Sequence, residues 1–224
     1  AAQKPENEGT AGHRMVVEGS PLAKTPSSPS THEGKRYLSY NQIHKTVASL
    51  ADAIREYKPD CMVAIGGGGF IPARMLRTFV KVPILTVSLE LYDDATNTRK
   101  EKPVKLQWFD SVSGVGERVE GKRVLVVDEV DDSRTTLQFC VEEILRDHTP
   151  AEMAVMVLHN KEKPKNGVLP KSVSYYAGES FPDVWCVYPW DATDIDDHER
   201  KAKLCEESSF TNRVSSTPLI ITSS

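Results

Sequence analysis

The sequence predicts an α/β protein built on a mostly parallel sheet that is flanked by helices. Short aliphatic runs typical of buried strands alternate along the chain with segments whose apolar residues recur at helical spacing. Strands that alternate with helices usually form a parallel sheet covered on both faces. The chain has 224 residues, of which 39% are hydrophobic, and this is enough for one domain with a substantial core.

The first predicted helix begins after Ser39. Ser39 and Gln42 have the spacing of a capping box, in which each side chain bonds the backbone N–H of the other residue. The helix should end at Lys58-Pro59-Asp60, because the residue before a proline is disfavoured in helical conformation. The apolar residues between these limits recur at helical spacing and are Ile43, Val47, Leu50, Ala51 and Ile54.

Two further helices and five strands are predicted after this first helix. The helices cover Pro72–Val80, where proline suits the first turn, and Thr135–Arg146. The predicted strands are Cys61–Ile65, Ile84–Leu89, Val124–Val127, Met153–Leu158 and Val173–Ala177. In such sheets ligands bind at the carboxyl ends of the strands, so the polar residues after each strand are the candidates for a site.

Both ends of the chain lack an apolar period. Residues 1–36 are rich in Pro, Gly, Ser, Thr and charge, and we expect a disordered arm there. A single folded domain is expected over residues 37–205, and the tail at 206–224, which contains Ser and Thr without a period, is expected to fray.

Composition excludes several classes of function. The net charge of -4 argues against general nucleic-acid binding, and no stretch is long enough to span a bilayer. The widely spaced Cys61, Cys140, Cys186 and Cys205 show no metal-ligand pairing, and the histidines have no metal spacing either. The beginning of the sequence lacks the layout of a signal peptide, so we expect a reducing, cytoplasmic setting.

The most informative stretch is the predicted strand at 124–127 together with the polar residues immediately after it. Four acidic residues, Asp128, Glu129, Asp131 and Asp132, come directly after the aliphatic run. Ser133, Arg134, Thr135 and Thr136 then lead into a predicted helix, whose free N–H groups and dipole favour an anion. Carboxylates beside an anion site are explained by a sugar phosphate, since they can accept hydrogen bonds from ribose hydroxyls and hold a metal. A charged turn without a ligand is the alternative.

This stretch resembles the signature of the type I phosphoribosyltransferases, which bind 5-phosphoribosyl-1-pyrophosphate (PRPP). The resemblance implies that Asp128 and Glu129 hold the ribose hydroxyls and a metal, and that Asp132 is the general base. It further implies that the 5-phosphate is held by Asp132, Ser133, Arg134, Thr135 and Thr136. The sequence departs from the family at Arg134, where many members have glycine. This arginine could add positive charge near the phosphate or point to solvent.

Four consecutive glycines, Gly66 to Gly69, form a second strand-to-helix turn. Glycine allows the backbone to approach a ligand closely, although a plain tight turn is an equally good interpretation of the run alone. In the resembling family this loop holds the pyrophosphate of PRPP, and the matching positions are Gly67 and Gly68. Purine-type members often carry Lys or Arg at the position of Gly67. Its absence leaves the pyrophosphate charge to magnesium and to backbone amides.

Residues 90–110 form a long polar connection between two predicted strands. A connection of this length is often a functional lid, and the family closes a flexible loop here over the reacting centre. An idle surface loop is the alternative. Trp108 is expected to anchor the loop in the core.

The segment at 181–191 predicts a purine base as substrate. Trp185 and Trp190 lie close together in an otherwise aromatic-poor chain. The resemblance makes Trp185 the ring that stacks on the purine, Cys186 a source of backbone contacts and Asp191 a magnesium ligand. Trp190 is expected in the core, and a core position for Trp185 is the alternative.

The family also places a lysine after the preceding strand, where its ammonium bonds the 6-oxo group of the purine. Lys161 matches this position, and Lys163 is the second choice. A lysine donor selects 6-oxopurines over adenine, whose 6-amino group would be a donor facing a donor.

The combined expectation is a type I phosphoribosyltransferase fold with a small hood. The enzyme would use Mg²⁺ to transfer phosphoribose from PRPP to hypoxanthine, guanine or xanthine. Two rivals stay open: an enzyme for another base, and a PRPP-binding regulatory protein without catalysis. A third, a PRPP synthase-like protein, would be longer, with a duplicated fold. We expect a homodimer or a larger homo-oligomer, with no nucleic-acid or membrane partner.

Overall fold

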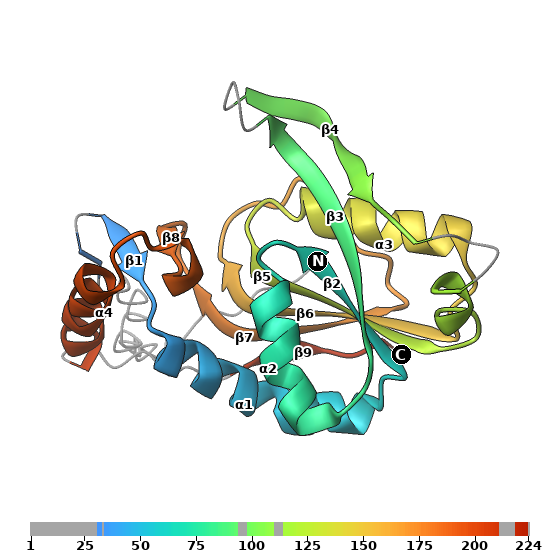
Figure 1. Cartoon of the computed structure of the whole chain (residues 1–224), viewed down its shortest axis with the longest axis horizontal. Coiled ribbons are helices and arrows are strands. Elements are labelled where there is room, and N and C mark those ends of the chain that lie inside the picture. Colours follow the sequence, from blue (N-terminus) through green and yellow to red (C-terminus); the bar gives the residue numbers. More distant parts are fainter. Residues whose placement is uncertain (1–30, 33, 94–97, 110–113, 211–217, 224) are drawn as a thin grey trace, which may run out of the picture.

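A seven-stranded sheet forms the centre of this computed structural model, which describes residues 31–32, 34–93, 98–109, 114–210 and 218–223 (Figure 1). The strand order is β4-β3-β2-β5-β6-β7-β9. Its strands are β2 (Cys61–Gly66), β3 (Ile84–Asp93), β4 (Thr98–Gln107), β5 (Arg123–Asp131), β6 (Glu152–Lys161), β7 (Val173–Phe181) and β9 (Leu219–Ile221). Strands β3, β2, β5, β6 and β7 are parallel, so the predicted fold class is confirmed.

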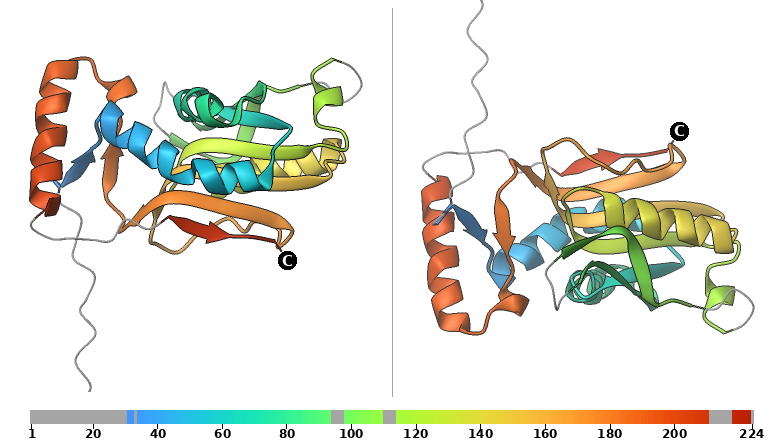
Figure 2. Two further views of the ribbon diagram at one scale, coloured as in Figure 1. Left: turned by 90° about the horizontal axis from the view of Figure 1, so that it is seen from below. Right: turned by 90° about the horizontal axis from the view of Figure 1, so that it is seen from above.

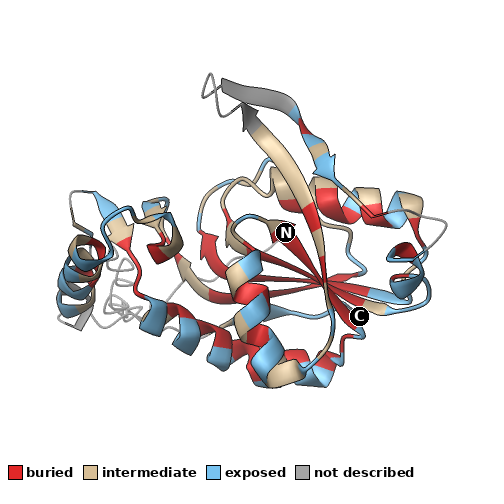
Figure 3. Cartoon of the chain, viewed as in Figure 1, coloured by how far each residue is buried: buried red, intermediate tan, exposed pale blue. Residues whose placement is uncertain are grey.

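Helices cover both faces of this sheet, and each face has its own apolar core (Figures 1 and 3). Helices α1 (Tyr40–Tyr57) and α2 (Phe70–Val80) pack on one face, and α3 (Thr135–Asp147) packs on the other. Both faces of the central strands are therefore buried, which accounts for their continuous aliphatic runs. None of the helices in the described ranges combines the length and the apolar character needed to cross a bilayer.

The predicted elements occur where the sequence placed them, with longer strands than expected. The capping box of α1 has both of its bonds, one from the Gln42 N–H to Ser39 Oγ at 3.2 Å and one from the Ser39 N–H to Gln42 Oε1 at 2.8 Å. Helix α2 starts two residues before Pro72, at Phe70. Strands β5, β6 and β7 each continue three or four residues beyond the predicted aliphatic run, into polar sequence.

A small hood stands at the carboxyl end of the large sheet (Figure 2). Strand β1 (Lys35–Tyr37) pairs in parallel with β8 (Trp185–Val187) in a separate two-stranded sheet, and α4 (Ile195–Phe210) packs beside β1. Between β8 and α4 lies η2, a single turn of 3₁₀ helix over Pro189–Asp191. The hood places the segment predicted to bind a purine above the ends of β5 and β6.

The region expected to be an irregular lid is mostly a long antiparallel ribbon made of β3 and β4, which projects from the sheet (Figure 1). The prediction missed β4 because its sequence is polar and contains Pro103, and proline is tolerated only in edge strands such as this one. Lys105 fixes the base of the ribbon on α3: its Nζ lies 2.5 Å from Glu143 and 4.1 Å from the Trp108 ring centroid. Trp108 packs partly buried against the core, as expected.

The ends of the chain differ from the expected boundaries. The predicted boundary at Tyr37 falls inside β1, which starts at Lys35, while residues 1–30 of the expected arm lie outside the described residues. Instead of fraying at Glu206, α4 continues to Phe210, and Leu219–Ile221 add β9 antiparallel to β7. A strand of three residues is too short to show a hydrophobic period.

Candidate active site

Asp128 and Glu129 lie within β5, not on the turn after it. Asp128 is only 8% exposed, and one of its oxygens accepts a hydrogen bond from the Glu129 N–H at 3.0 Å. Burial, followed by the negative charge of Glu129, raises the pKa of Asp128 well above its ordinary value. A cation at this point, or hydroxyl donors, would favour the ionised form of the pair.

The glycine turn lies directly against these acids. A side chain on Gly68 would collide with the Glu129 carboxylate, whose nearest oxygen is 1.7 Å from the position of the missing Cβ. Glycine at this position therefore lets the Glu129 carboxylate lie directly against the turn. A side chain on Gly67 would meet no atom within 4 Å, so this position faces open space. The Gly66-Gly67 peptide is cis.

The turn after β5 has the form expected of an anion site. Helix α3 begins at Thr135, and its first N–H groups have no partner within the helix. Ser133 Oγ lies 3.0 Å from Thr135 Oγ1. Arg134 takes the left-handed conformation with φ of 65°, a conformation that favours glycine and that fits the glycine found there in many family members.

The side chain of Arg134 turns back into the protein. Its Nε and Nη2 donate to Asp131 Oδ2 at 2.9 and 2.6 Å, and its guanidinium lies 4.8 Å from the Tyr175 ring centroid. It thus adopts neither of the two orientations considered from the sequence, because it neutralises a neighbouring acid. Its contribution to the turn is its backbone.

Asp132 lies at the centre of a cluster of charges. Its Oδ1 is 3.0 Å from Lys161 Nζ and 2.7 Å from Lys163 Nζ. Asp183 pairs with the same two lysines, at 3.6 Å from Lys161 and 3.0 Å from Lys163. Both lysines considered from the sequence therefore lie at this point. Burial raises the pKa of the Asp132 carboxyl, but Lys163 and Lys161 outweigh burial and leave that pKa below its ordinary value.

Trp185 extends its ring into solvent beside this cluster. It is 68% exposed, which is unusual for a tryptophan, and the Lys161 ammonium lies 5.9 Å from the ring centroid. The alternative of a core position for Trp185 is wrong. Cys186 pairs with Arg36 of β1, and burial raises the pKa of its thiol to about 11.

Trp190 belongs to the packed base of the hood, as expected. Its ring stacks on Tyr188 with 4.6 Å between centroids and an interplanar angle of 6°. Tyr188 Oη lies 2.8 Å from His159 Nδ1 and donates to the Glu129 carbonyl at 3.3 Å, and burial lowers the pKa of His159 to about 3. Tyr188 thus joins the hood to β5 through the Glu129 carbonyl and to β6 through the neutral imidazole of His159.

Asp191 is exposed on η2, and desolvation and the charge of Glu129 raise its pKa. Among the described residues, no three His, Cys, Asp or Glu side chains converge closely enough to hold a metal ion by themselves. Asp128, Glu129 and Asp191 are thus electrostatically linked but do not form a complete metal site.

Sequence reasoning missed several residues that support the site. The resemblance assigns no role to Asp131, yet this residue is fully buried and accepts a hydrogen bond from Tyr175 Oη at 2.8 Å. Lys165 and Asp183 were also missed. Their contacts join segments far apart in the chain, so no local pattern marks them. For Lys165 the sequence offers one signal, which is its closeness along the chain to Lys161 and Lys163.

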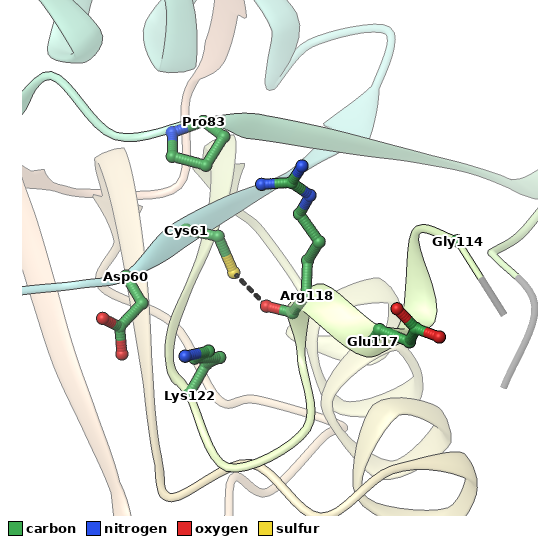
Figure 4. Close-up of a pocket in the computed structure, with 7 residues that line it drawn as sticks. All are labelled: Asp60, Cys61, Pro83, Gly114, Glu117, Arg118 and Lys122. Carbon is green, nitrogen blue, oxygen red and sulfur yellow. Dashed lines mark hydrogen bonds between the residues drawn. The ribbon is translucent and has the colours of Figure 1, made fainter. Parts of the chain in front are cut away.

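A cavity of about 490 Å³ lies at the other end of the strands (Figure 4). It contains Cys61, the first residue of β2, whose Sγ donates to the Arg118 carbonyl at 3.4 Å. The cavity contains none of the predicted site residues, and parallel sheets bind ligands at the opposite end. Its lining residues are Asp60, Cys61, Pro83, Gly114, Glu117, Arg118 and Lys122.

Known proteins resemble this chain over most of its length. Residues 35–189 match the model of the phosphoribosyl transferase domain. The hypoxanthine-guanine phosphoribosyltransferase of Schizosaccharomyces pombe is 43% identical over 73% of this chain and 92% of its own length. The xanthine phosphoribosyltransferase 1 of Saccharomyces cerevisiae is 38% identical over 75% of this chain and 95% of its own length.

A solved structure supports the same conclusion. A hypothetical protein from Neisseria gonorrhoeae, solved with bound ppGpp, is 45% identical with a TM-score of 0.68, and the match covers 78% of this chain and 97% of that one. The range matched by the family model, residues 35–189, includes the glycine turn, the acidic strand end, the lysine cluster and Trp185. The chain therefore belongs to the phosphoribosyl transferase domain family.

Proposed function

We propose that this protein is a purine salvage enzyme that transfers the 5-phosphoribosyl group of PRPP to a 6-oxopurine, with release of pyrophosphate. The observation that carries the proposal is the convergence of three side chains from different segments. The acid Asp132, the amine of Lys161 and the exposed ring of Trp185 lie together beside the acidic end of β5. A planar base that offers a carbonyl oxygen to an ammonium fits this arrangement.

The reaction exchanges one bond at the anomeric carbon of the ribose. The bond from that carbon to the pyrophosphate oxygen breaks, and a bond to purine N9 forms. The proton displaced from the purine passes to Asp132 as general base. Asp128 and Glu129 accept hydrogen bonds from the ribose hydroxyls, and charged hydrogen bonds of this kind contribute about 1.5–3 kcal/mol each.

Anion binding is assigned to backbone groups and hydroxyls. The turn from Asp132 to Thr136 takes the 5-phosphate at the N-terminus of α3. The backbone at Gly67 and Gly68 takes the pyrophosphate, and the open space beside Gly67 leaves room for it.

Mg²⁺ is assigned to the acidic pair, because hard cations prefer carboxylate oxygens and the raised pKa of Asp128 reflects an unfavourable concentration of negative charge. Asp128, Glu129 and Asp191 would hold it, with most of its ligands coming from substrate and water. When bound, it supplies positive charge that stabilises the pyrophosphate leaving group.

Purine binding is expected to activate the base. With no purine bound, Lys161 and Lys163 both lie against Asp132 and depress its pKa. A 6-oxo group that draws the Lys161 ammonium away removes one of these two partners. The pKa of Asp132 then rises, and the carboxylate becomes a stronger proton acceptor when the substrate is in place.

The rival functions are less well supported. A lysine donor opposes the 6-amino group of adenine, and the exposed tryptophan suits a base better than a purely regulatory PRPP site. The similar Neisseria gonorrhoeae protein was solved with bound ppGpp, a guanine nucleotide. A cytoplasmic homodimer or larger homo-oligomer completes the proposal.

The proposal is tested by mixing the protein with PRPP, Mg²⁺ and, separately, guanine, hypoxanthine, xanthine, adenine and orotate. Nucleotide formation followed by absorbance should occur with at least one 6-oxopurine. Turnover with adenine or orotate alone would refute the assignment of the base site. PRPP binding without turnover of any base would favour the regulatory rival.

Replacement of the proposed base should slow the chemistry with little change in fold. Asp132→Asn is expected to lower kcat by about 10²–10⁴, the usual contribution of general base catalysis. Steady-state kinetics at saturating PRPP measures this loss, with Asp183→Asn as the matched control, because Asp183 shares the two lysines. Near-normal turnover in the Asp132 variant would remove it from this role.

The two lysines should differ in their effect on purine use. Lys161→Ala is expected to reduce kcat/KM for 6-oxopurines by about tenfold or more with a smaller effect on the KM for PRPP, because Lys161 lies beside the Trp185 ring. Lys163→Ala is the control. If kcat/KM for 6-oxopurines falls more in the Lys163 variant than in the Lys161 variant, the ammonium that bonds the 6-oxo group is that of Lys163.

The buried Asp128 carboxylate should lower the free energy of unfolding of the ligand-free protein at neutral pH. Because the pKa of Asp128 is raised in the folded state, the ligand-free protein loses stability as the pH rises from the ordinary aspartate pKa to the raised value. Asp128→Asn should therefore raise the Tm of the ligand-free protein at pH 7 while weakening Mg²⁺–PRPP binding. Scanning calorimetry and titration with PRPP measure the two effects. A lower Tm at pH 7 would contradict the assignment.

A further inference from the structure

The connection between β6 and β7 contacts the turn from Asp132 to Thr136, here called the phosphate turn. One lysine of this connection, Lys165, makes a hydrogen bond to that turn. Lys165 Nζ donates to the carbonyl oxygens of Asp131 at 2.6 Å, Asp132 at 3.0 Å and Lys161 at 2.8 Å. An ammonium has three donors, and each of them is used. Two of the carbonyls belong to the end of β5 and the turn after it, and the third belongs to the end of β6.

The next two residues hold the following carbonyl of the same turn. The N–H groups of Asn166 and Gly167 donate to the Ser133 carbonyl at 2.9 and 3.1 Å. Three successive carbonyls, those of Asp131, Asp132 and Ser133, are thus held by the connection after β6. Within a trans peptide the C=O and the next N–H point in opposite directions. Holding these carbonyls therefore directs the N–H groups of the turn away from the connection, toward the proposed 5-phosphate.

The Lys165 side chain and the carboxylate beside it are largely shielded from water. The side chain of Lys165 is 15% exposed, and its Nζ lies 3.4 Å from Oδ1 of the fully buried Asp131. Oδ2 of Asp131 is occupied by Arg134 and Tyr175. Removal of the lysine would take a charged donor from all three carbonyls, of which that of Lys161 keeps a second donor, the Lys163 N–H at 2.9 Å. Asp131 Oδ1 would lose the nearby positive charge, and the carbonyls of Asp131 and Asp132 would find a replacement for the ammonium only if the backbone moves. The part that can move is the turn, because Lys161 is held in the sheet by its pairing with β7.

We propose that Lys165 is a positioning residue for phosphoribosyl transfer, which holds the amides of the phosphate turn in the orientation that binds the 5-phosphate of PRPP. The inference rests on the proposed function, because it assumes that this turn receives PRPP. Lys165 does not itself touch the substrate. Its effect should therefore fall on PRPP and not on the purine.

The first test compares Lys165→Met with Lys171→Met, which removes an exposed lysine of the same connection. Titration calorimetry with PRPP and Mg²⁺ should show binding weakened about tenfold or more for the Lys165 variant and unchanged binding for the control. In steady-state kinetics the KM for PRPP should rise by a similar factor, while the KM for guanine changes by less than about threefold. A purely structural role would not produce this division between the two substrates.

A second variant leaves the lysine in place. A side chain on Gly167 would stand 2.5 Å from the Arg134 carbonyl oxygen, so Gly167→Ala must displace the turn. It should also weaken PRPP binding, and it decides the question if the Lys165 variant does not fold.

PRPP affinity equal to that of the wild type in the variants that fold would overturn the proposal, and so would an equal rise in both KM values. PRPP binding by the wild type without turnover would refute only the proposed function, and the affinity comparison would still decide the role of Lys165.

Discussion

The site depends on keeping four acidic side chains and an anion-binding turn within one strand-to-helix connection. Like charges at this distance would repel each other and the phosphate, so each acid needs its own partner. Asp131 is buried against Arg134, Tyr175 and Lys165, and Asp132 lies between two lysines. Only Asp128 and Glu129 lie as a close pair of carboxylates against the glycine turn, where the ribose and Mg²⁺ are proposed to bind. Cationic partners thus offset the charges of Asp131 and Asp132, while the pair Asp128 and Glu129 is left for the substrate and the metal.

The same partners connect the part of the site proposed to bind the purine with the part proposed to bind PRPP. Lys161 belongs to the strand beside β5 and pairs with Asp132, and the hood contacts β5 through Tyr188. A ligand that moves Lys161 changes the environment of Asp132, and a ligand on the turn acts on a segment fastened by Lys165. Binding of the purine and of PRPP is therefore assigned to one connected set of charges and hydrogen bonds.

The fold and much of the site could be predicted from local sequence. Helical spacing after Ser39 and aliphatic runs before the polar strand ends are local signals. They predicted helix α1 and strands such as β5 at the positions where the structure has them. Strand β4 and the three-residue β9 carry no such signal, because the first is polar and the second is too short. The orientation of Arg134 and the role of Lys165 depend on contacts between segments, which periodicity does not encode.

The most direct test of the central claim is a crystal structure of the protein with GMP, the product expected from guanine. We expect the phosphate on the turn from Ser133 to Thr136, the ribose hydroxyls at Asp128 and Glu129, and the guanine ring on Trp185 with its 6-oxo group at the Lys161 ammonium. A phosphate bound elsewhere, or a guanine ring away from Trp185, would contradict the proposed site.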